Sequence, residues 1–143
     1  MRMERLSPLL GEWDLQTSLA PPGAVRAVVT FEPVLGGRFL LQRTEIDPPV
    51  APDSMSVIAA DGDAFTQHYF DSRGVVRVYA MTFDGRTWTL RREAADFSPL
   101  DFAQRYVGVL SEDGARIEGR WESRPPDADD WALDFELTYV RRR

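Results

Sequence analysis

The sequence predicts an all-β domain in which ten antiparallel strands wind up and down into a closed barrel, with a short N-terminal helix closing one end. Most of the chain alternates apolar and polar residues with the period of two that is typical of strands. Long, proline-rich connections between the expected strands alternate with short, glycine-based ones. Beyond the first ten residues, helical periodicity is nearly absent. The expected strands are 12–19, 24–32, 38–46, 54–60, 64–70, 75–83, 87–92, 101–110, 116–122 and 131–140.

The segment before the first strand carries an apolar stripe at helical spacing, formed by Met3, Leu6, Leu9 and Leu10. Because this segment leads directly into the first strand, we expect one or two helical turns that plug the floor of the barrel. Up-and-down geometry places a group of bulky residues near this floor, where we expect them to pack as structural anchors. They are Trp13, Phe83, Trp88, Ile117 and Tyr139.

Several expected strands have one face that is clearly bulkier than the other. The last strand carries Trp131, Leu133, Phe135, Leu137 and Tyr139 on one face, and the ninth carries Ile117, Gly119 and Trp121. Such alternation suits an antiparallel sheet with one wet face. Without helices to cover them, ten strands of this kind need two packed sheets or a closed barrel, and uniform hairpin spacing favours the barrel. A ten-stranded barrel has spare interior volume.

The breaks between strands predict two different ends. In an up-and-down barrel the long breaks at 47–53, 93–100 and 123–130 fall on one rim, and the short glycine turns fall on the other. The barrel would then have a sealed floor and an open mouth. Residues 71–74 read DSRG, which suits a type I turn in which Asp71 accepts backbone N–H groups, in preference to a catalytic loop.

The composition fits one domain over residues 1–143 and excludes several function classes. The net charge is −6, and all 17 basic residues are arginine. An acidic chain without a basic cluster argues against nucleic acid as a partner. Cysteine is absent, which excludes disulfides, thiolate metal sites and cysteine nucleophiles. No signal-peptide pattern and no apolar run long enough to span a bilayer is present, so we expect a cytoplasmic protein without membrane insertion.

Several motifs resemble one protein family. Gly11-Glu12-Trp13 opens the first strand, and the stretches HYFDSRGVVRVYAM (68–81), DFAQRYVG (101–108), DGARIEGRWE (113–122) and WALDFELTY (131–139) follow. Together they resemble a bacterial calycin-like family of uncharacterised domains, related to lipocalins, fatty-acid-binding proteins and nitrobindin-like barrels. The resemblance implies the barrel fold and no established activity, because fold alone does not fix function.

Nitrobindin-like proteins bind haem through a histidine near the end of the barrel, and a haem-binding protein of this kind is a second alternative that the residues present disfavour. The last strand has no histidine, and 14–17 replace the glycine-rich stretch that follows the opening motif in those proteins. His68 is the sole histidine and shares a face with Thr66 and Phe70, opposite the bulkier face of Phe65 and Tyr69. We therefore expect no haem, no metal and no other cofactor.

The inward, mouth-side positions carry the candidate ligand-binding residues, which are Arg77, Tyr79, Tyr69, Gln104, Trp121 and Trp131. Arg77 shares a face with Tyr79 and two further apolar residues. An arginine on an aromatic inner face needs a carboxylate, water or an anionic ligand. Glu45 on the third strand could pair with it, or Arg77 could clamp a ligand, and both alternatives stay open. The Arg-x-Tyr pattern is similar to the carboxylate clamp of fatty-acid-binding proteins, although theirs lies on a different strand.

We therefore expect a protein that binds a small, largely apolar or amphiphilic molecule with a polar or anionic group inside the barrel. Two further alternatives are an isomerase or cyclase of a small metabolite, with Tyr69 or Tyr79 as the acid, and a lumen filled by its own side chains. The mouth is expected to expose few apolar residues outside the strands, which favours a monomer or a homodimer.

Overall fold

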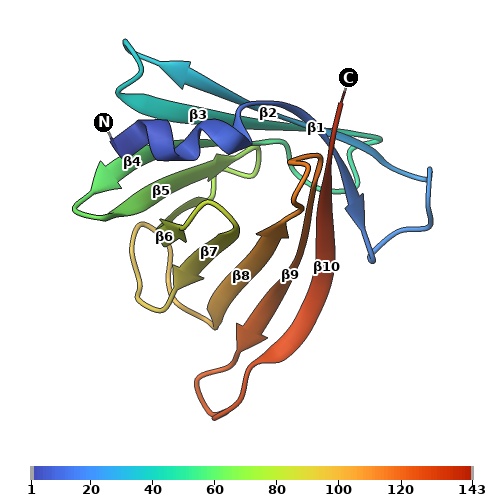
Figure 1. Ribbon diagram of the computed structural model, residues 1–143. Coiled ribbons are helices and arrows are strands. Elements are labelled where there is room, and N and C mark those ends of the chain that lie inside the picture. The colour runs from blue at the N-terminus through green and yellow to red at the C-terminus, as the bar shows by residue number, and fades with distance from the viewer. Residues whose placement is uncertain (1, 143) are drawn as a thin grey trace.

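In the computed structural model, which describes residues 2–142, ten antiparallel strands close into a barrel (Figure 1). The predicted all-β barrel with a short N-terminal helix is confirmed. The elements are η1 (Arg2–Leu9, a 3₁₀ helix), β1 (Gly11–Thr17), β2 (Arg26–Val34), β3 (Phe39–Asp47), β4 (Ser54–Asp61), β5 (Ala64–Asp71), β6 (Val76–Phe83), β7 (Thr87–Arg92), β8 (Ala103–Leu110), β9 (Arg116–Arg124) and β10 (Ala132–Arg141).

Each strand pairs with its neighbours in sequence, and β1 pairs with β10 to close the ring. The closing register runs from Trp13 opposite Arg141 to Thr17 opposite Leu137. The strand ends predicted from the sequence agree with these bounds to within two residues. Among the described residues, no helix has both the length and the apolar character needed to cross a membrane.

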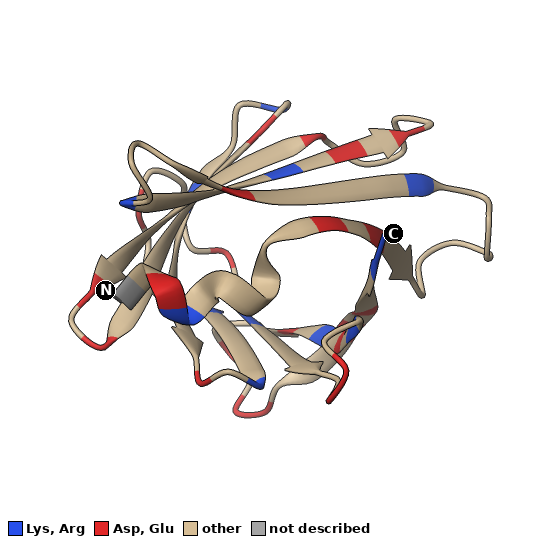
Figure 2. Ribbon diagram, turned by 45° about the horizontal axis from the view of Figure 1, so that its top comes forward, with Lys and Arg blue, Asp and Glu red and all other residues tan. Residues whose placement is uncertain are grey.

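The barrel has two unlike ends because successive strands run in opposite directions. The short turns after β2, β4, β6 and β8 lie at the end that η1 covers, and the connections 18–25, 48–53, 93–102 and 125–131 lie at the other. The predicted gathering of the long loops on one rim is confirmed. In Figure 2 the helix lies across the ring of strands, and acidic and basic residues are interspersed over the walls and loops.

Helix η1 seals the floor through its apolar stripe, and two arginines, one in η1 and one in β10, hold it in place. Leu6 and Leu9 are fully buried, and the Trp13 indole donates to the Leu9 carbonyl over 2.9 Å. Arg5 donates to the carbonyls of Asp63 and Phe83, each over 3.0 Å. From β10, Arg141 donates to the carbonyls of Pro8 and Leu10, which closes the plug from the opposite side. The predicted floor helix is confirmed.

An aromatic cluster fills the lower half of the interior. The Tyr139 ring lies at its centre, with its centroid 5.4–6.4 Å from those of Trp13, Phe31, Trp88 and Tyr106. Edge-on and tilted contacts of this kind are the favoured aromatic geometries. All the anchors predicted for the floor are at most 5% exposed, so this part of the sequence analysis is confirmed. In the lower interior these rings therefore pack against one another.

Two glycines on neighbouring strands make space for one of these rings. Gly108 and Gly119 are cross-strand partners, and the Tyr106 ring lies directly against both. A Cβ atom at Gly119 would overlap the phenol of Tyr106. Neither glycine needs a left-handed backbone, so the requirement for glycine is purely steric.

Replacing Gly119 by alanine should lower the free energy of unfolding by about 1–3 kcal/mol, the usual cost of overpacking a filled core. Urea unfolding monitored by tryptophan fluorescence measures this difference. Arg120→Ala, at an exposed position of the same strand, is the control and should change stability by less than about 0.5 kcal/mol. Equal stability of the Gly119→Ala variant and the parent protein would contradict the packing described for Tyr106.

Candidate functional site

Above the aromatic cluster, the inward positions of β3–β6 and β8 become polar. We call this set the polar belt; its members are Gln42, Ser56, Gln67, Tyr69, Arg77, Tyr79 and Gln104. Successive members face one another across the strands: Gln42 opposite Ser56, Ser56 opposite Tyr69, and Tyr69 opposite Arg77. The belt therefore follows the inner wall as a continuous band.

The alternation of each strand explains why these side chains enter the lumen. Every second residue of β6 faces the lumen. Buried Phe83 and Met81 lie toward the floor, Tyr79 comes next, and Arg77 lies at the mouth. The same face therefore changes from apolar to polar as it rises. Tyr79 is buried and Arg77 is half-buried, so solvent exposure on this face of β6 falls from the mouth toward the floor.

Arg77 has few partners for a half-buried cation. Its Nη1 donates to Gln104 Oε1 over 3.4 Å, and the same oxygen accepts the Tyr79 hydroxyl over 3.1 Å. Its Nε is buried and has no hydrogen-bond partner. Within residues 2–142, no carboxylate forms an ion pair with Arg77.

The alternative pairing of Arg77 with Glu45 does not form. Gln42 and Thr44 on β3 are buried and face the lumen, whereas Glu45 is exposed and has the opposite parity. Glu45 therefore lies on the outer wall, and two strands, β4 and β5, separate β3 from β6. The open alternatives for Arg77 reduce to water or an anionic ligand.

Tyr69 is held by the turn that follows β5. Its hydroxyl donates to Asp71 Oδ2 over 2.8 Å, and Arg73 Nη2 donates to the same oxygen over 2.7 Å. The other oxygen, Oδ1, accepts the backbone N–H of Arg73 over 2.9 Å. This is the arrangement expected from the DSRG pattern, and the interpretation of Asp71 as a turn residue is confirmed.

The two tyrosines of the belt are neutral hydrogen-bond donors. Burial raises the pKa of Tyr69, and its hydrogen bond to the Asp71 carboxylate raises that pKa further. Burial also raises the pKa of Tyr79, although the neighbouring Arg77 opposes the change. Their rings meet edge to face with centroids 6.2 Å apart, and Trp121 lies 5.7 Å beyond Tyr79. The structure thus brings Arg77, Gln104 and these three aromatic side chains together.

Trp131 does not join them, and its predicted place at the lumen entrance is wrong. The β9–β10 register shifts between Leu133, which faces Glu122, and Phe135, which faces Trp121. This bulge turns the segment before Phe135 toward the outer wall. The Trp131 ring there lies between the guanidinium groups of Arg105, at 4.4 Å, and Arg124, at 5.0 Å.

Sequence reasoning missed a second arginine near the belt. Arg92 is only 3% exposed and is neutralised by Asp96, to which it donates over 2.9 and 3.0 Å. These hydrogen bonds hold the pKa of Asp96 well below its usual range. Asp96 also accepts the Val78 N–H over 2.7 Å, so the loop 93–102 completes the wall where β6 extends beyond β7. The four-residue spacing of Arg92 and Asp96 is the sequence signal that could have indicated this ion pair.

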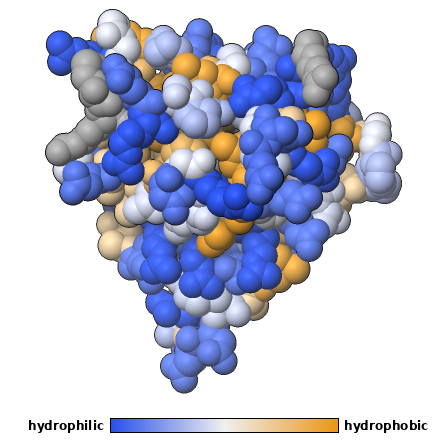
Figure 3. Space-filling view, in the orientation of Figure 1, coloured by the Kyte–Doolittle hydropathy of each residue, from blue (hydrophilic) through white to orange (hydrophobic). Residues whose placement is uncertain are grey.

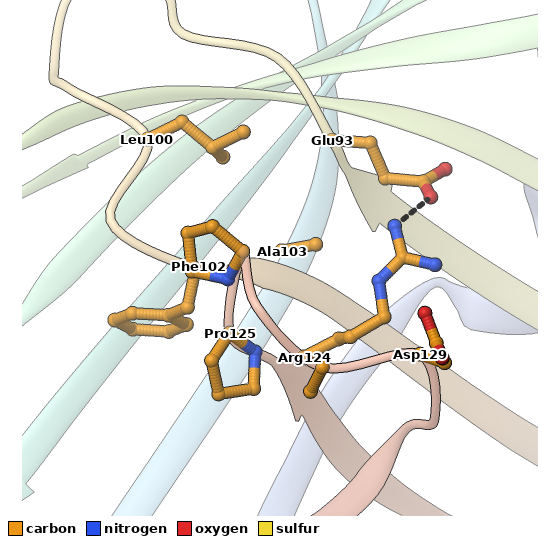
Figure 4. Close-up of a pocket in the computed structure, with 9 residues that line it drawn as sticks. Glu93, Leu100, Phe102, Ala103, Arg124, Pro125 and Asp129 are labelled. Carbon is orange, nitrogen blue, oxygen red and sulfur yellow. Dashed lines mark hydrogen bonds and ion pairs between the residues drawn. The ribbon is translucent and has the colours of Figure 1, made fainter.

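Two hollows of the rim lie outside the belt. One, of about 310 Å³, lies between the loops 93–102 and 125–131, where Arg124 and Glu93 approach within 3.5 Å over the apolar side chains of Leu100, Phe102 and Pro125 (Figure 4). The other, of about 330 Å³, lies between the loops 48–53 and 72–75. No polar-belt residue lines either hollow.

His68 faces away from the lumen, between inward-facing Gln67 and Tyr69, and its cross-strand neighbours are Val57 and Val78. No group of three or more histidine or acidic side chains among residues 2–142 is arranged to hold a metal ion. A scan against protein-family models and a search of curated proteins each found no match to this chain. The calycin-like resemblance therefore remains a prediction from the sequence motifs.

Asp71 should make stability depend on pH in a defined window. Burial raises its pKa, but hydrogen bonds from Arg73, Tyr69 and the backbone outweigh burial and lower the pKa to about 2. Because this folded-state pKa lies below the unfolded value of about 3.9, the stabilisation is complete above pH ~4 and is lost as the pH falls through about 2.

Asp71→Asn should therefore be less stable than the parent protein at neutral pH, and the difference should shrink as the pH falls through this window. Urea unfolding of both proteins from neutral to acid pH measures it. Asp134→Asn, at an exposed position, is the control. A difference that stays constant down to pH ~2 would show that the Asp71 carboxylate carries no such role.

Proposed function

We propose that the protein reversibly binds a small amphiphilic molecule whose anionic or polar group enters the upper lumen beside Arg77. One observation carries the proposal: the Arg77 guanidinium is half-buried, lacks a carboxylate partner within the described chain, and has a buried Nε without a hydrogen-bond partner. Removing a cation from water without a counter-charge is unfavourable. An anionic ligand would supply the missing charge and accept the unused N–H.

The neighbouring side chains suit a ligand that also donates a hydrogen bond. Gln67 donates to Ser56 Oγ over 3.3 Å, while its own Oε1 is buried without a partner. Gln42 Oε1 is likewise buried without a hydrogen-bond partner. Aromatic walls with a few convergent polar groups are typical of small-molecule sites. A carboxylate or similar anion that carries a hydroxyl or amine donor would satisfy both kinds of unused group.

The filled floor limits the length of the ligand. Below Tyr79 the interior is occupied by Met81, Phe83 and the aromatic cluster, all at most 5% exposed. An acyl chain cannot extend into that half without displacing packed rings. The apolar part of the ligand must therefore lie toward the mouth, against Tyr69 and Trp121. We infer that the ligand is a compact amphiphile and not a long-chain fatty acid.

An isomerase or cyclase reaction in the same cup receives less support. Such a reaction would need Tyr69 or Tyr79 to donate a proton, and a catalytic acid works best when its pKa lies near the working pH. Burial moves the pKa of both phenols in the opposite direction. The two neutral phenols suit hydrogen bonding to a ligand that is released without chemical change.

Replacing Arg77 by leucine should weaken the binding of octanoate, used as a probe, by about 1.5–3 kcal/mol, the usual range for a charged hydrogen bond. Isothermal titration calorimetry measures the affinity. The variant should remain folded, because replacing a buried cation that lacks a counter-charge by an apolar residue often costs little stability. Arg43→Leu, at an exposed position of the outer wall, is the matched control and should bind as the parent does.

Equal affinity of the Arg77→Leu and Arg43→Leu variants would overturn the proposed role of Arg77. Failure of the parent protein to bind octanoate and the corresponding alkyl sulfate and phosphate would overturn the proposed function itself.

A further inference from the structure

Two glutamine side chains of the polar belt carry buried carbonyl oxygens without a partner in the described chain. Gln42 is 8% exposed and Gln67 is 4% exposed, and the Oε1 atom of each accepts no hydrogen bond. Leaving a buried acceptor unpaired is unfavourable, and almost all buried polar groups in folded proteins are paired. The two oxygens are therefore a second feature of the lumen, beside the Arg77 guanidinium, that a bound molecule would complete.

The protein already uses the nitrogen of each amide. Gln67 Nε2 donates to Ser56 Oγ over 3.3 Å, and Ser56 is itself buried. Gln42 reaches the Tyr139 hydroxyl: burial raises the pKa of that phenol, and its hydrogen bond with Gln42 opposes the rise. A hydrogen bond lowers the pKa of a phenol when the phenol oxygen accepts, so Gln42 is the donor there. Each amide thus leaves its oxygen, an acceptor, unused.

The register places these oxygens close to Arg77. Gln67 lies opposite Tyr79, and Tyr69 lies opposite Arg77, so Gln67 and Arg77 are diagonal neighbours on the inner face of β5 and β6. Diagonal neighbours across antiparallel strands are about 7–8 Å apart. Gln42 follows on β3, two strands beyond β5. A group bound by Arg77 and a group bound by Gln67 would therefore be joined by a short spacer, comparable to one aromatic ring.

Two tyrosines lie where such a ring would be held. The four inward positions form a square in which Arg77 and Gln67 occupy one diagonal and Tyr69 and Tyr79 occupy the other. The tyrosine rings meet edge to face with centroids 6.2 Å apart. A flat ring placed between the cation and the amide would contact both of them, and aromatic contacts of this kind are favourable.

The belt contains no carboxylate that would balance a second cation. Its members are neutral apart from Arg77, and Asp71 at the end of β5 already accepts hydrogen bonds from Tyr69 and Arg73. An ammonium group would lose its hydration beside Arg77 without gaining a counter-charge. An amino group attached to an aromatic ring is neutral at neutral pH and has two N–H donors, so it matches two uncharged acceptors.

The rim does not offer comparable groups. The expectation that the mouth would expose few apolar residues is wrong, because Leu19, Val50, Phe97 and Phe102 are all exposed on its loops. They are spread over three connections, and the face seen in Figure 3 shows separate apolar patches among hydrophilic side chains. Among the described residues, no buried polar atom that lacks a partner belongs to either rim hollow. Such atoms lie inside the barrel.

We propose that the ligand is a compact aromatic acid with a neutral amino group, whose carboxylate meets Arg77 and whose N–H groups donate to Gln67 and Gln42. This proposal rests on the proposed function, because it takes the lumen as the binding site, and it names the chemical class of the ligand. A fatty acid or an alkyl sulfate would satisfy Arg77 but would leave both glutamine oxygens unpaired. Sites with buried hydrogen-bonding groups discriminate strongly against ligands that leave those groups unpaired.

Isothermal titration calorimetry of the full chain with 4-aminobenzoate and 3-aminobenzoate tests the proposal, each compared with the methylbenzoate of the same substitution pattern. A methyl group has nearly the size of an amino group but donates no hydrogen bond. At least one aminobenzoate should bind about tenfold more tightly than its methyl counterpart, as two neutral hydrogen bonds imply. The matching nitrobenzoate, whose substituent only accepts hydrogen bonds, should show no such gain.

Gln67→Met removes the amide at nearly constant volume and should bring the ratio of the amino and methyl affinities close to one. Gln42→Met should reduce the same ratio. Gln16→Met, the same substitution at an exposed position of β1, is the matched control and should keep the ratio of the parent. Circular dichroism verifies that each variant is folded, and the ligand series on the parent protein is decisive even if a variant does not fold.

The outcomes separate this proposal from the proposed function. A parent protein that binds octanoate or a methylbenzoate but gains nothing from the amino group would overturn the proposal and leave the binding function in place. A preference that survives in full in both glutamine variants would do the same, as would a nitrobenzoate that binds more tightly than its methyl counterpart. Binding of none of these compounds, octanoate included, would overturn the proposed function as well.

Discussion

The rest of the structure depends on one constraint, which is that a closed barrel sends every second side chain of its strands into a single interior. That interior has no second sheet to share it and no edge through which water can reach unpaired groups. Each inward residue must therefore pack against another or find a polar partner. At the floor the chain meets most of this demand with interlocking rings around Tyr139 and with glycines where the Tyr106 ring needs space, although the Trp88 indole nitrogen there has no hydrogen-bond partner. At the mouth it meets the demand only in part.

Three arginines with limited exposure show the difference. Arg141 at the floor stacks on Trp13 and donates to three backbone carbonyls. Arg92 in the wall is neutralised by Asp96 and tied to the loop 93–102. Arg77 contacts the neutral side chains of Gln104 and Tyr79 and has no carboxylate partner within the described residues, and two buried glutamine oxygens of the same belt also lack partners. Of the four buried polar atoms without a partner among the described residues, Gln42 Oε1, Gln67 Oε1 and Arg77 Nε belong to the polar belt, and the fourth is the Trp88 indole nitrogen in the floor cluster.

The sequence predicted the barrel, the strand ends and the floor because period-two alternation and turn residues are local signals. The same alternation placed Arg77, Tyr79, Tyr69 and Gln104 on inward faces, since no bulge interrupts β5, β6 or β8 in the mouth half. It failed at Trp131, because the run 131–139 alternates without a break and nothing local marks the register shift at Asp134. Glu45 was misassigned because a single strand does not show which of its faces is inner when both carry large side chains.

The central claim is that the Arg77 guanidinium is an uncompensated donor awaiting an anion, and side-chain NMR of isotope-labelled protein tests it most directly. On titration with octanoate, the Arg77 Nε–H resonance should shift saturably and exchange more slowly with water, while that of exposed Arg43 stays unchanged. An Arg77 Nε–H resonance that is already protected without ligand and does not respond to the titration would contradict the account.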